Sequence, residues 1–245
     1  MAALIISVAS VQAQKSQVIA HRGYWKTAGS AQNSITSLQK ADSIHCYGSE
    51  FDVWLAKDNK LVVNHDPVYK MKYMEYSKGD ALTGLKLSHG ENLPSLQKYL
   101  EAGKKCNTKL ILELKAHNSK KRETKAVQEI LAMVKKMGLA DRMEYITFSL
   151  HAMKEFIRLA PAGTSVFYLN GELSPKELKD LGAAGLDYHM GVIKKHPEWI
   201  KEAHDLGLKV NVWTVDKAED MKWLIDQKVD FITTNEPIVA QDMLK

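Results

Sequence analysis

A histidine and an arginine directly follow an apolar run near the start of the chain. In "VIAHRGYW", residues 18 to 25, His21 and Arg22 come immediately after three apolar residues. A basic pair is a poor ending for a strand whose only task is packing. Histidine can exchange a proton near neutral pH, and arginine binds anions such as phosphate through its fork of N–H groups. The pair therefore predicts an acid or base beside a bound anion.

Acidic side chains occur in two later segments that resemble strands. Glu50 and Asp52 are one residue apart in "GSEFDVWLA", so on a strand both point to the same face. Glu113 lies among leucines in "KLILELK", and Lys115 shares its face. Carboxylates that face one another repel unless a cation or a proton balances them. Three of them on neighbouring strands predict a site for one divalent cation, Mg²⁺ or Ca²⁺; the alternative for Glu113 is a core carboxylate paired with Lys115.

A second histidine follows the carboxylate pair along the chain. His65 ends the short run "LVVNH", which is separated from the first acidic strand by the turn "KDNK". Two histidines beside a divalent cation suit the cleavage of a phosphodiester. One takes a proton from the attacking hydroxyl, and the other gives a proton to the leaving oxygen. Arg22 and Lys115 would neutralise charge on the phosphoryl oxygens.

Alternating strand-like and helix-like segments must position these side chains. Strands are expected at 17–23, 48–56, 109–115, 144–150, 165–171, 186–192, 209–215 and 230–235. Helical patterns are expected between them, at 34–46, 94–104, 121–137, 151–159, 175–181, 197–206 and 218–225. This alternation predicts an α/β fold, a closed (β/α)8 barrel, with a doubly wound open sheet as the alternative. No glycine-rich phosphate loop follows the first strand, which disfavours the open sheet.

One segment interrupts the alternation after the second strand. Residues 66–93 have no clear period, and a loop of this length in a compact domain is usually functional. We expect an insertion here, anchored at His65, whose tyrosines and methionines form a wall beside the leaving alcohol or only pack the loop onto the barrel. These side chains are Tyr69, Met71, Tyr73, Met74 and Tyr76.

The quoted motifs resemble the glycerophosphodiester phosphodiesterase family. "HRG", "SEFDVWLAKDNKLVVNHDP", "LILELK", "VNVWTV" and "TTNEP" occur in this order over nearly the whole chain after the leader. The resemblance implies a (β/α)8 barrel with an insertion after the second strand. It also implies hydrolysis of glycerophosphodiesters to an alcohol and glycerol phosphate with a divalent metal.

The same resemblance implies a role for each matching residue. His21 and His65 would be the catalytic acid/base pair, and Arg22 and Lys115 would contact phosphate. Trp213, at a strand end, would line the pocket for the apolar part of the substrate. The metal ligands would be Glu50, Asp52 and Glu113.

One position departs from the pattern of the family. The family usually has "PEN" after the first motif, whereas this chain has Ala31, Gln32 and Asn33. Gln32 places a neutral amide where a carboxylate is usual, which lowers the negative charge of the site by one. We therefore treat Gln32 as a neighbour of the site and not as a ligand.

Composition and the first residues set further bounds. The 245 residues carry 34 basic and 29 acidic side chains, a net charge of +5, which does not by itself indicate nucleic-acid binding. Residues 1–14, "MAALIISVASVQAQ", resemble part of a signal peptide and are too short for a stable membrane span, so we expect a periplasmic or secreted protein. Residues 15–245 are expected to form one domain. Cys46 and Cys106 form no CxxC pair and are either free thiols or, after export, a disulfide.

Two other functions remain open at this point. A phospholipase would keep the barrel and cleave a lysophospholipid or an inositol phospholipid. A non-catalytic barrel would only bind a phosphate ligand, with Gln32 marking the loss of activity. The retention of both His21 and His65 disfavours this second alternative. The lysines within residues 66–93 make the expected wall unsuited to two acyl chains, which favours small, water-soluble diesters. The oligomeric state stays open.

Overall fold

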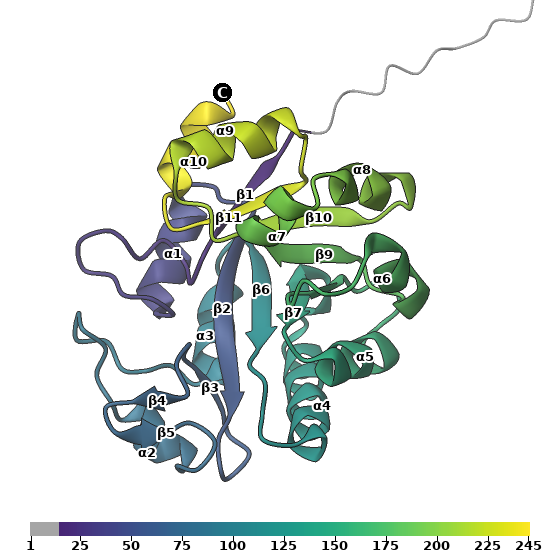
Figure 1. The fold of residues 1–245 in the computed structure, drawn as a ribbon. Coiled ribbons are helices and arrows are strands. Elements are labelled where there is room, and N and C mark those ends of the chain that lie inside the picture. The colour runs from purple at the N-terminus through teal and green to yellow at the C-terminus, as the bar shows by residue number, and fades with distance from the viewer. Residues whose placement is uncertain (1–14) are drawn as a thin grey trace, which may run out of the picture.

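Residues 15–245 of the computed structural model can be described, and they form a closed barrel. Nine strands join one sheet in the order β1-β11-β10-β9-β8-β7-β6-β2-β3, and β1 also pairs with β2. That last pairing closes the sheet, because β1 then has a parallel neighbour on each side. The expected (β/α)8 barrel is confirmed, and the open sheet is excluded (Figure 1).

The barrel wall consists of the parallel strands of this sheet. They are β1 (Gln17–Ala20), β2 (Gly48–Leu55), β6 (Lys109–Leu114), β7 (Met143–Thr147), β8 (Val166–Tyr168), β9 (Gly185–His189), β10 (Lys209–Trp213) and β11 (Phe231–Thr234). Only β3 (Leu61–Val63) runs antiparallel within this sheet, against β2, so the chain turns back toward the barrel mouth before His65.

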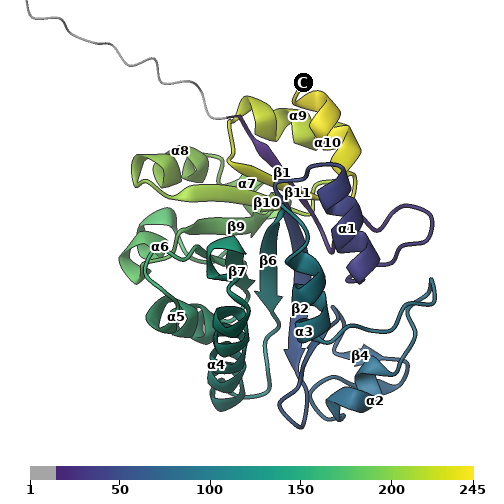
Figure 2. The same ribbon diagram turned by 180° about the vertical axis from the view of Figure 1, so that it is seen from behind.

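An outer layer of helices covers the strands (Figures 1 and 2). Its members are α1 (Ile35–Ser43), α3 (Leu96–Gly103), α4 (Lys120–Met137), α5 (Leu150–Leu159), α6 (Pro175–Leu181), α8 (Glu198–Asp205), α9 (Ala218–Asp226) and α10 (Pro237–Met243). Serine side chains cap the first turns of α1, α3, α4, α5 and α6 by accepting a backbone N–H. Two further helices lie between these elements along the chain: a 3₁₀ helix (Ala140–Arg142) between α4 and β7, and α7 (Met190–Lys195) between β9 and α8.

Two apolar layers hold the barrel together. The larger lies between strands and helices and includes Leu38, Phe51 and Tyr99. The smaller fills the barrel interior with Ile19, Ile111, Ile146, Phe167, Leu169 and Phe231. Because large side chains occupy the interior, the polar groups described below are confined to one end of the barrel.

The insertion after β3 has its own small core. It contains β4 (Val68–Tyr69), β5 (Lys72–Tyr73) and α2 (Gly79–Thr83), and it lies beside β2 and β3 at the lower left of Figure 1. Trp54 on β2 and Met74 of the insertion are buried in this core. Met74 therefore packs the insertion onto the barrel, whereas Met71, Tyr73 and Tyr76 are exposed. Of the two alternatives left open for these side chains, packing onto the barrel therefore holds for Met74.

One of the expected strands is shorter in the structure than predicted. The strand expected at 186–192 ends at His189, because the His189 side chain accepts the Gly191 N–H and caps α7.

The expected leader, 1–14, lies outside the described residues. Cys46 and Cys106 are both buried free thiols. Within 15–245, no helix is long and apolar enough to cross a membrane.

The turn after β1 requires a glycine at position 23. Gly23 has a φ of +77°, and a Cβ there would lie 2.6 Å from Ser37 Cβ and 2.7 Å from the Ser37 carbonyl carbon. We expect Gly23→Ala to lower the free energy of unfolding by about 2–3 kcal/mol, through backbone strain and overlap with α1. Denaturant titration measures this loss.

Gly29 is the matched control for this substitution. Its φ is +70°, but nothing lies within 4 Å of the position of its Cβ. Gly29→Ala should lose only the strain of the positive φ, about 1 kcal/mol. Equal losses in the two variants would show that the close approach of Ser37 is not what constrains Gly23.

Candidate active site

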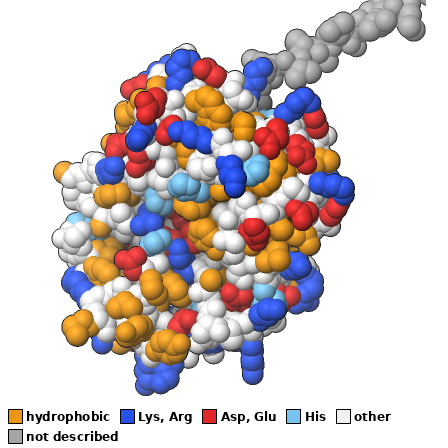
Figure 3. Space-filling view, viewed as in Figure 1, with side chains coloured by type: hydrophobic (Ala, Val, Ile, Leu, Met, Phe, Trp, Pro, Cys, Tyr) orange, Lys and Arg blue, Asp and Glu red, His pale blue; other side chains and the backbone are white. Residues whose placement is uncertain are grey.

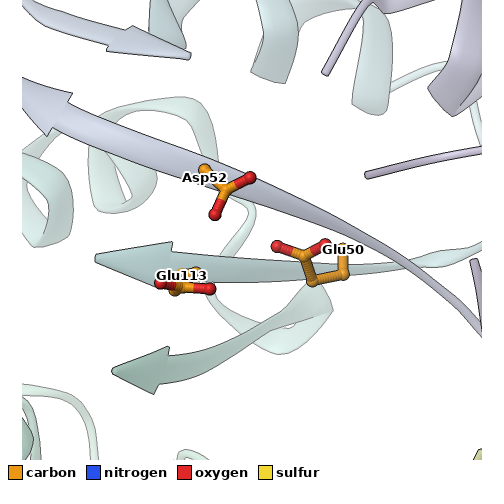
Figure 4. A group of neighbouring side chains, drawn as sticks. All are labelled: Glu50, Asp52 and Glu113. Atoms are coloured by element: carbon orange, nitrogen blue, oxygen red, sulfur yellow. The ribbon is translucent and has the colours of Figure 1, made fainter. Parts of the chain in front are cut away.

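Three buried carboxyl groups meet at one end of the barrel. Glu50 and Asp52 project from β2 and Glu113 from β6, and the register pairs Asp52 with Glu113 (Figure 4). One ligand oxygen from each residue lies within 4.8 Å of the others. The exposed fractions are 3% for Glu50, 1% for Asp52 and 8% for Glu113. The residues that the sequence predicted as metal ligands are therefore together.

Asp52 has hydrogen bonds and opposite charges around both of its oxygens. Asn33 Nδ2 donates to Asp52 Oδ2 at 2.8 Å, and the Asp52 N–H donates to Asn33 Oδ1 at 3.0 Å. Lys115 Nζ lies 3.2 Å from Asp52 Oδ1, and Arg22 Nε lies 3.7 Å from Oδ2. Burial raises the pKa of Asp52, but Lys115, His65, Arg22 and Asn33 outweigh burial, so the pKa is lowered.

The carboxyl groups of Glu50 and Glu113 have less opposite charge around them than Asp52 has. Burial, with the neighbouring Asp52, raises the pKa of Glu113 to about 7, although Lys115 Nζ lies 2.7 Å from Glu113 Oε1. Burial and the charges of Asp52 and Glu113 also raise the pKa of Glu50 well above its usual range. Two basic side chains, Arg22 and Lys115, thus face three carboxyl groups.

This excess of carboxyl groups over basic side chains suits the binding of a divalent cation. Glu50 Oε1 is buried and has no hydrogen-bond partner among residues 15–245. The group contains only carboxylate oxygens, the ligands that Mg²⁺ and Ca²⁺ prefer. A cation bound to Glu50, Asp52 and Glu113 would balance the charge that now raises two pKa values.

The backbone after β1 bends sharply to bring Arg22 to the carboxylates. Arg22 has a φ of 56°, which is unusual for a residue with a side chain, and Gly23 follows with a positive φ. The Arg22 N–H donates to Glu50 Oε2 at 2.7 Å. Its guanidinium donates through Nη1 to Gln32 Oε1 at 2.8 Å. Gln32 therefore holds the arginine without neutralising it.

Residues near the C-terminal end of the chain hold the ring of His21 in one orientation. His21 Nδ1 lies 2.9 Å from Asn235 Oδ1, and Trp25 Nε1 donates to the same oxygen at 3.0 Å. Asn235 Nδ2 donates to Asp216 Oδ2 at 2.8 Å, which fixes the orientation of the amide. Since Asn235 Oδ1 can only accept, His21 carries its proton on Nδ1 and leaves Nε2 as an acceptor. Burial and the nearby charge of Arg22 lower the pKa of His21 to about 4.

His65 has a different environment. Its Nδ1 lies 2.8 Å from Asp66 Oδ1, and its side chain is 36% exposed. Its backbone is held by Trp54, whose Nε1 donates to the His65 carbonyl at 3.3 Å. The ring of His65 therefore has a carboxylate as its partner, whereas the ring of His21 has an amide oxygen.

A cavity of about 250 Å³ connects these groups. His21, Arg22, Glu50, His65 and Glu113 line its polar side. The apolar side consists of Ile146, Phe148, Leu169 and Trp213. Figure 3 shows acidic, basic and histidine side chains gathered near the middle of this face.

Two predicted site residues stand outside the lining of this cavity. Asp52 and Lys115 contact residues that line it, Arg22 and Glu113 respectively. A larger cavity of about 620 Å³, beside the 58–60 turn, α3 and α4, contains none of the predicted site residues, so we do not assign the chemistry to it.

Sequence reasoning missed the residues that orient the site. Asn33, Asn235 and Asp216 have no expected role above, although Asn33 and Asn235 lie in the quoted segments "AQN" and "TTNEP". For Asn235 the available signal was its position directly after β11, whereas nothing in the sequence indicated the partner of Asn33.

Comparisons with known proteins agree with this geometry. The sequence profile of the glycerophosphoryl diester phosphodiesterase family matches residues 21–239. A crystal structure of a glycerophosphodiester phosphodiesterase from Parabacteroides distasonis is similar, with a TM-score of 0.93 and 52% identity over 94% of this chain and 97% of that chain. A glycerophosphodiester phosphodiesterase from Caldanaerobacter subterraneus is 27% identical over 238 residues, 91% of this chain and 95% of the relative.

A more distant structure shares the fold. A phosphodiesterase from Oleispira antarctica, solved in complex with the product sn-glycerol-3-phosphate, has a TM-score of 0.82 and 21% identity over 94% of this chain and 97% of that chain. The match to the family covers most of the chain. The protein therefore belongs to the glycerophosphoryl diester phosphodiesterase family and is a phosphoric diester hydrolase.

The environment of His21 makes a prediction about its titration. Because its pKa is lowered to about 4, the ring should stay neutral, with the proton on Nδ1, from pH 8 down to about pH 5. A bound cation would lower the pKa further. ¹⁵N NMR of the imidazole nitrogens measures both the tautomer and the pKa. A ring that titrates near 6.5, or carries its proton on Nε2, would contradict the hydrogen bond to Asn235.

Proposed function

We propose that the protein hydrolyses glycerophosphodiesters to an alcohol and sn-glycerol 3-phosphate, with one Mg²⁺ or Ca²⁺ ion held by Glu50, Asp52 and Glu113. The observation that carries this proposal is the shared cavity, which brings two histidines, an arginine and two of the carboxylates to one small volume. When bound, the ion would supply positive charge for a phosphoryl oxygen.

The basic side chains bind and orient the phosphate in this proposal. The Arg22 guanidinium lines the cavity and keeps its charge, because its partner at 2.8 Å is the neutral Gln32. Lys115 bridges Asp52 and Glu113 and adds a second positive charge beside them. These groups would stabilise negative charge that develops on the phosphoryl oxygens.

The two histidines divide the proton transfers. His21 Nε2 is an acceptor and takes a proton from the attacking water. The new O–P bond forms as the bond from phosphorus to the leaving oxygen breaks. His65, whose Nδ1 lies beside Asp66, gives a proton to that leaving oxygen. Trp213 and Phe148 line the wall beside the substrate.

The size of the cavity favours a small substrate. About 250 Å³ holds a deacylated headgroup but is below the usual range for a drug-sized ligand. Tyr69 of the insertion lines a neighbouring cavity with His65. Met71, Tyr73 and Tyr76 are exposed and line neither cavity. We therefore propose water-soluble diesters such as glycerophosphocholine, glycerophosphoethanolamine or glycerophosphoglycerol as substrates.

One assay tests this function against the phospholipase and the non-catalytic alternatives. Glycerophosphocholine, lysophosphatidylcholine and phosphatidylcholine in detergent are incubated separately, with and without chelator, and the products are identified by mass spectrometry. We expect choline and sn-glycerol 3-phosphate from glycerophosphocholine, no turnover in chelator, and a lower kcat/KM for both lipids.

Single substitutions in the same assay test the two histidines. His21→Ala and His65→Ala should each lower kcat by about 10²–10⁴-fold, the usual contribution of one general acid or base. Lys120→Ala, on the first turn of α4, is a control that should leave kcat unchanged. Faster cleavage of a lipid would favour the phospholipase alternative, and an absence of turnover on all three substrates would favour the binding protein.

A further inference from the structure

The cavity contains a carboxyl group that has no part in the proposed chemistry. Asp187 lies on β9 and is 2% exposed. It lines the same cavity as His21, Glu50 and Glu113. It belongs neither to the metal-ligand group nor to the hydrogen bonds that orient the histidines. Its side chain therefore needs a separate explanation.

One oxygen of Asp187 lacks a hydrogen-bond partner. Asp187 Oδ1 is buried, and nothing in the described part of the chain donates to it. Asn211 is a hydrogen-bonding neighbour of the carboxyl group, and its amide also exchanges hydrogen bonds with Thr233 at 2.9 and 3.1 Å. A buried polar atom without a partner in a folded protein is rare and calls for an occupant of the space beside it.

Two buried carboxyl groups of the barrel outside the metal-ligand group have clear partners. Glu144 on β7 accepts a hydrogen bond from the Tyr47 hydroxyl at 2.5 Å. Asp230 is paired with Lys209 at 2.7 Å and with His204 at 2.9 Å. Burial raises the pKa of Asp187 well above its usual range, and the charges of two other carboxyl groups, Glu113 and Glu144, add to this increase. A neutral group with both donor and acceptor character suits such a carboxyl better than an anion does.

The surrounding walls limit the shape of that group. Phe148 and Trp213 meet edge to face with their ring centroids 5.5 Å apart. Trp213 Nε1 is occupied, because it donates to the Asp187 backbone carbonyl at 2.9 Å. Leu169 and Ile146 add aliphatic surface. The walls thus offer apolar contact to C–H groups, and Asp187 offers a free hydrogen-bonding oxygen.

We propose that Asp187 binds a hydroxyl of the substrate's glycerol moiety and so selects glycerol-bearing phosphates over simple alkyl phosphates. The proposal deepens the proposed function and rests on it for the nature of the substrate. Its physical basis is the unpaired oxygen at the wall of a cavity that also contains the phosphate-binding arginine. A site built to bond a hydroxyl rejects an analogue that lacks it, because the buried polar group is then left unpaired.

A binding experiment tests Asp187 without relying on turnover. The probes are sn-glycerol 3-phosphate and n-propyl phosphate, which carries the same charge without the two hydroxyls. Isothermal titration with Ca²⁺ present measures both dissociation constants for the parent protein, Asp187→Leu and Asp187→Asn. We expect the parent to bind sn-glycerol 3-phosphate at least about 10-fold more tightly. Asp187→Leu should lose this preference while its affinity for n-propyl phosphate stays within about threefold.

Two further variants separate this role from a structural one. Asp187→Asn keeps a hydrogen-bonding side chain of the same shape and should retain most of the preference. Glu144→Gln changes a buried carboxyl of the same barrel that does not line the cavity, so its preference should equal that of the parent. Thermal unfolding of all four proteins checks that each is folded.

The outcomes distinguish this proposal from the proposed function. Equal binding of the two probes by the parent, or an unchanged preference in Asp187→Leu, would overturn the role of Asp187. Should Asp187→Leu not fold, Asp187→Gly takes its place: loss of the preference in Asp187→Gly would support hydroxyl binding if Glu144→Gln keeps it, and a retained preference in Asp187→Gly would overturn it. A parent that prefers sn-glycerol 3-phosphate but does not hydrolyse its diesters would contradict the proposed function alone.

Discussion

The mutual repulsion of three buried carboxyl groups is the constraint on which the rest of the site depends. Glu50, Asp52 and Glu113 approach within 4.8 Å with almost no exposure to water. Arg22 and Lys115 supply two positive charges, both of them close to Asp52. The three pKa values therefore shift in different directions: the pKa of Asp52 is lowered, while the pKa values of Glu50 and Glu113 are raised. A divalent cation is the partner that would allow all three groups to ionise together.

Closure of the barrel pairs the first strand with the last and thereby sets which ring nitrogen of His21 carries the proton. His21 follows β1 and Asn235 follows β11, and these strands pair over Gln17–Ala20 and Phe231–Thr234. The amide of Asn235 then lies between His21 and Asp216. His65, by contrast, is reached through the antiparallel β3, and its partner Asp66 is the next residue. The proposed proton acceptor, His21, is thus held by contacts between distant segments, and the proposed donor, His65, by a local one.

The sequence predicted the barrel and the grouping of three carboxyl groups, because both follow from short periods. Alternation along β2 places Glu50 and Asp52 on one face, and the parallel neighbour β6 brings Glu113 beside them. The bend after β1 was not predictable in detail, since the positive φ of Arg22 depends on contacts with Glu50 and with the residues around Asn33. Asn235 and Asp216 were missed as well, because their hydrogen-bond partners follow other strands of the barrel. Asp187 was missed because its place beside the cavity depends on the closed barrel. The two alternatives for Met74 could not be separated from the sequence, because burial in the small core of the insertion follows no period.

The central claim, that the three carboxyl groups bind one divalent cation, is tested most directly by anomalous diffraction. Crystals of the parent protein grown with Mn²⁺ as a substitute for Mg²⁺, and crystals of Asp52→Asn grown in parallel, would be measured at the manganese absorption edge. We predict a single strong anomalous peak within coordinating distance of oxygens from Glu50, Asp52 and Glu113 in the parent, and a weaker peak or none in the variant. No anomalous peak among these three residues in the parent, or a peak held by other residues, would contradict the account.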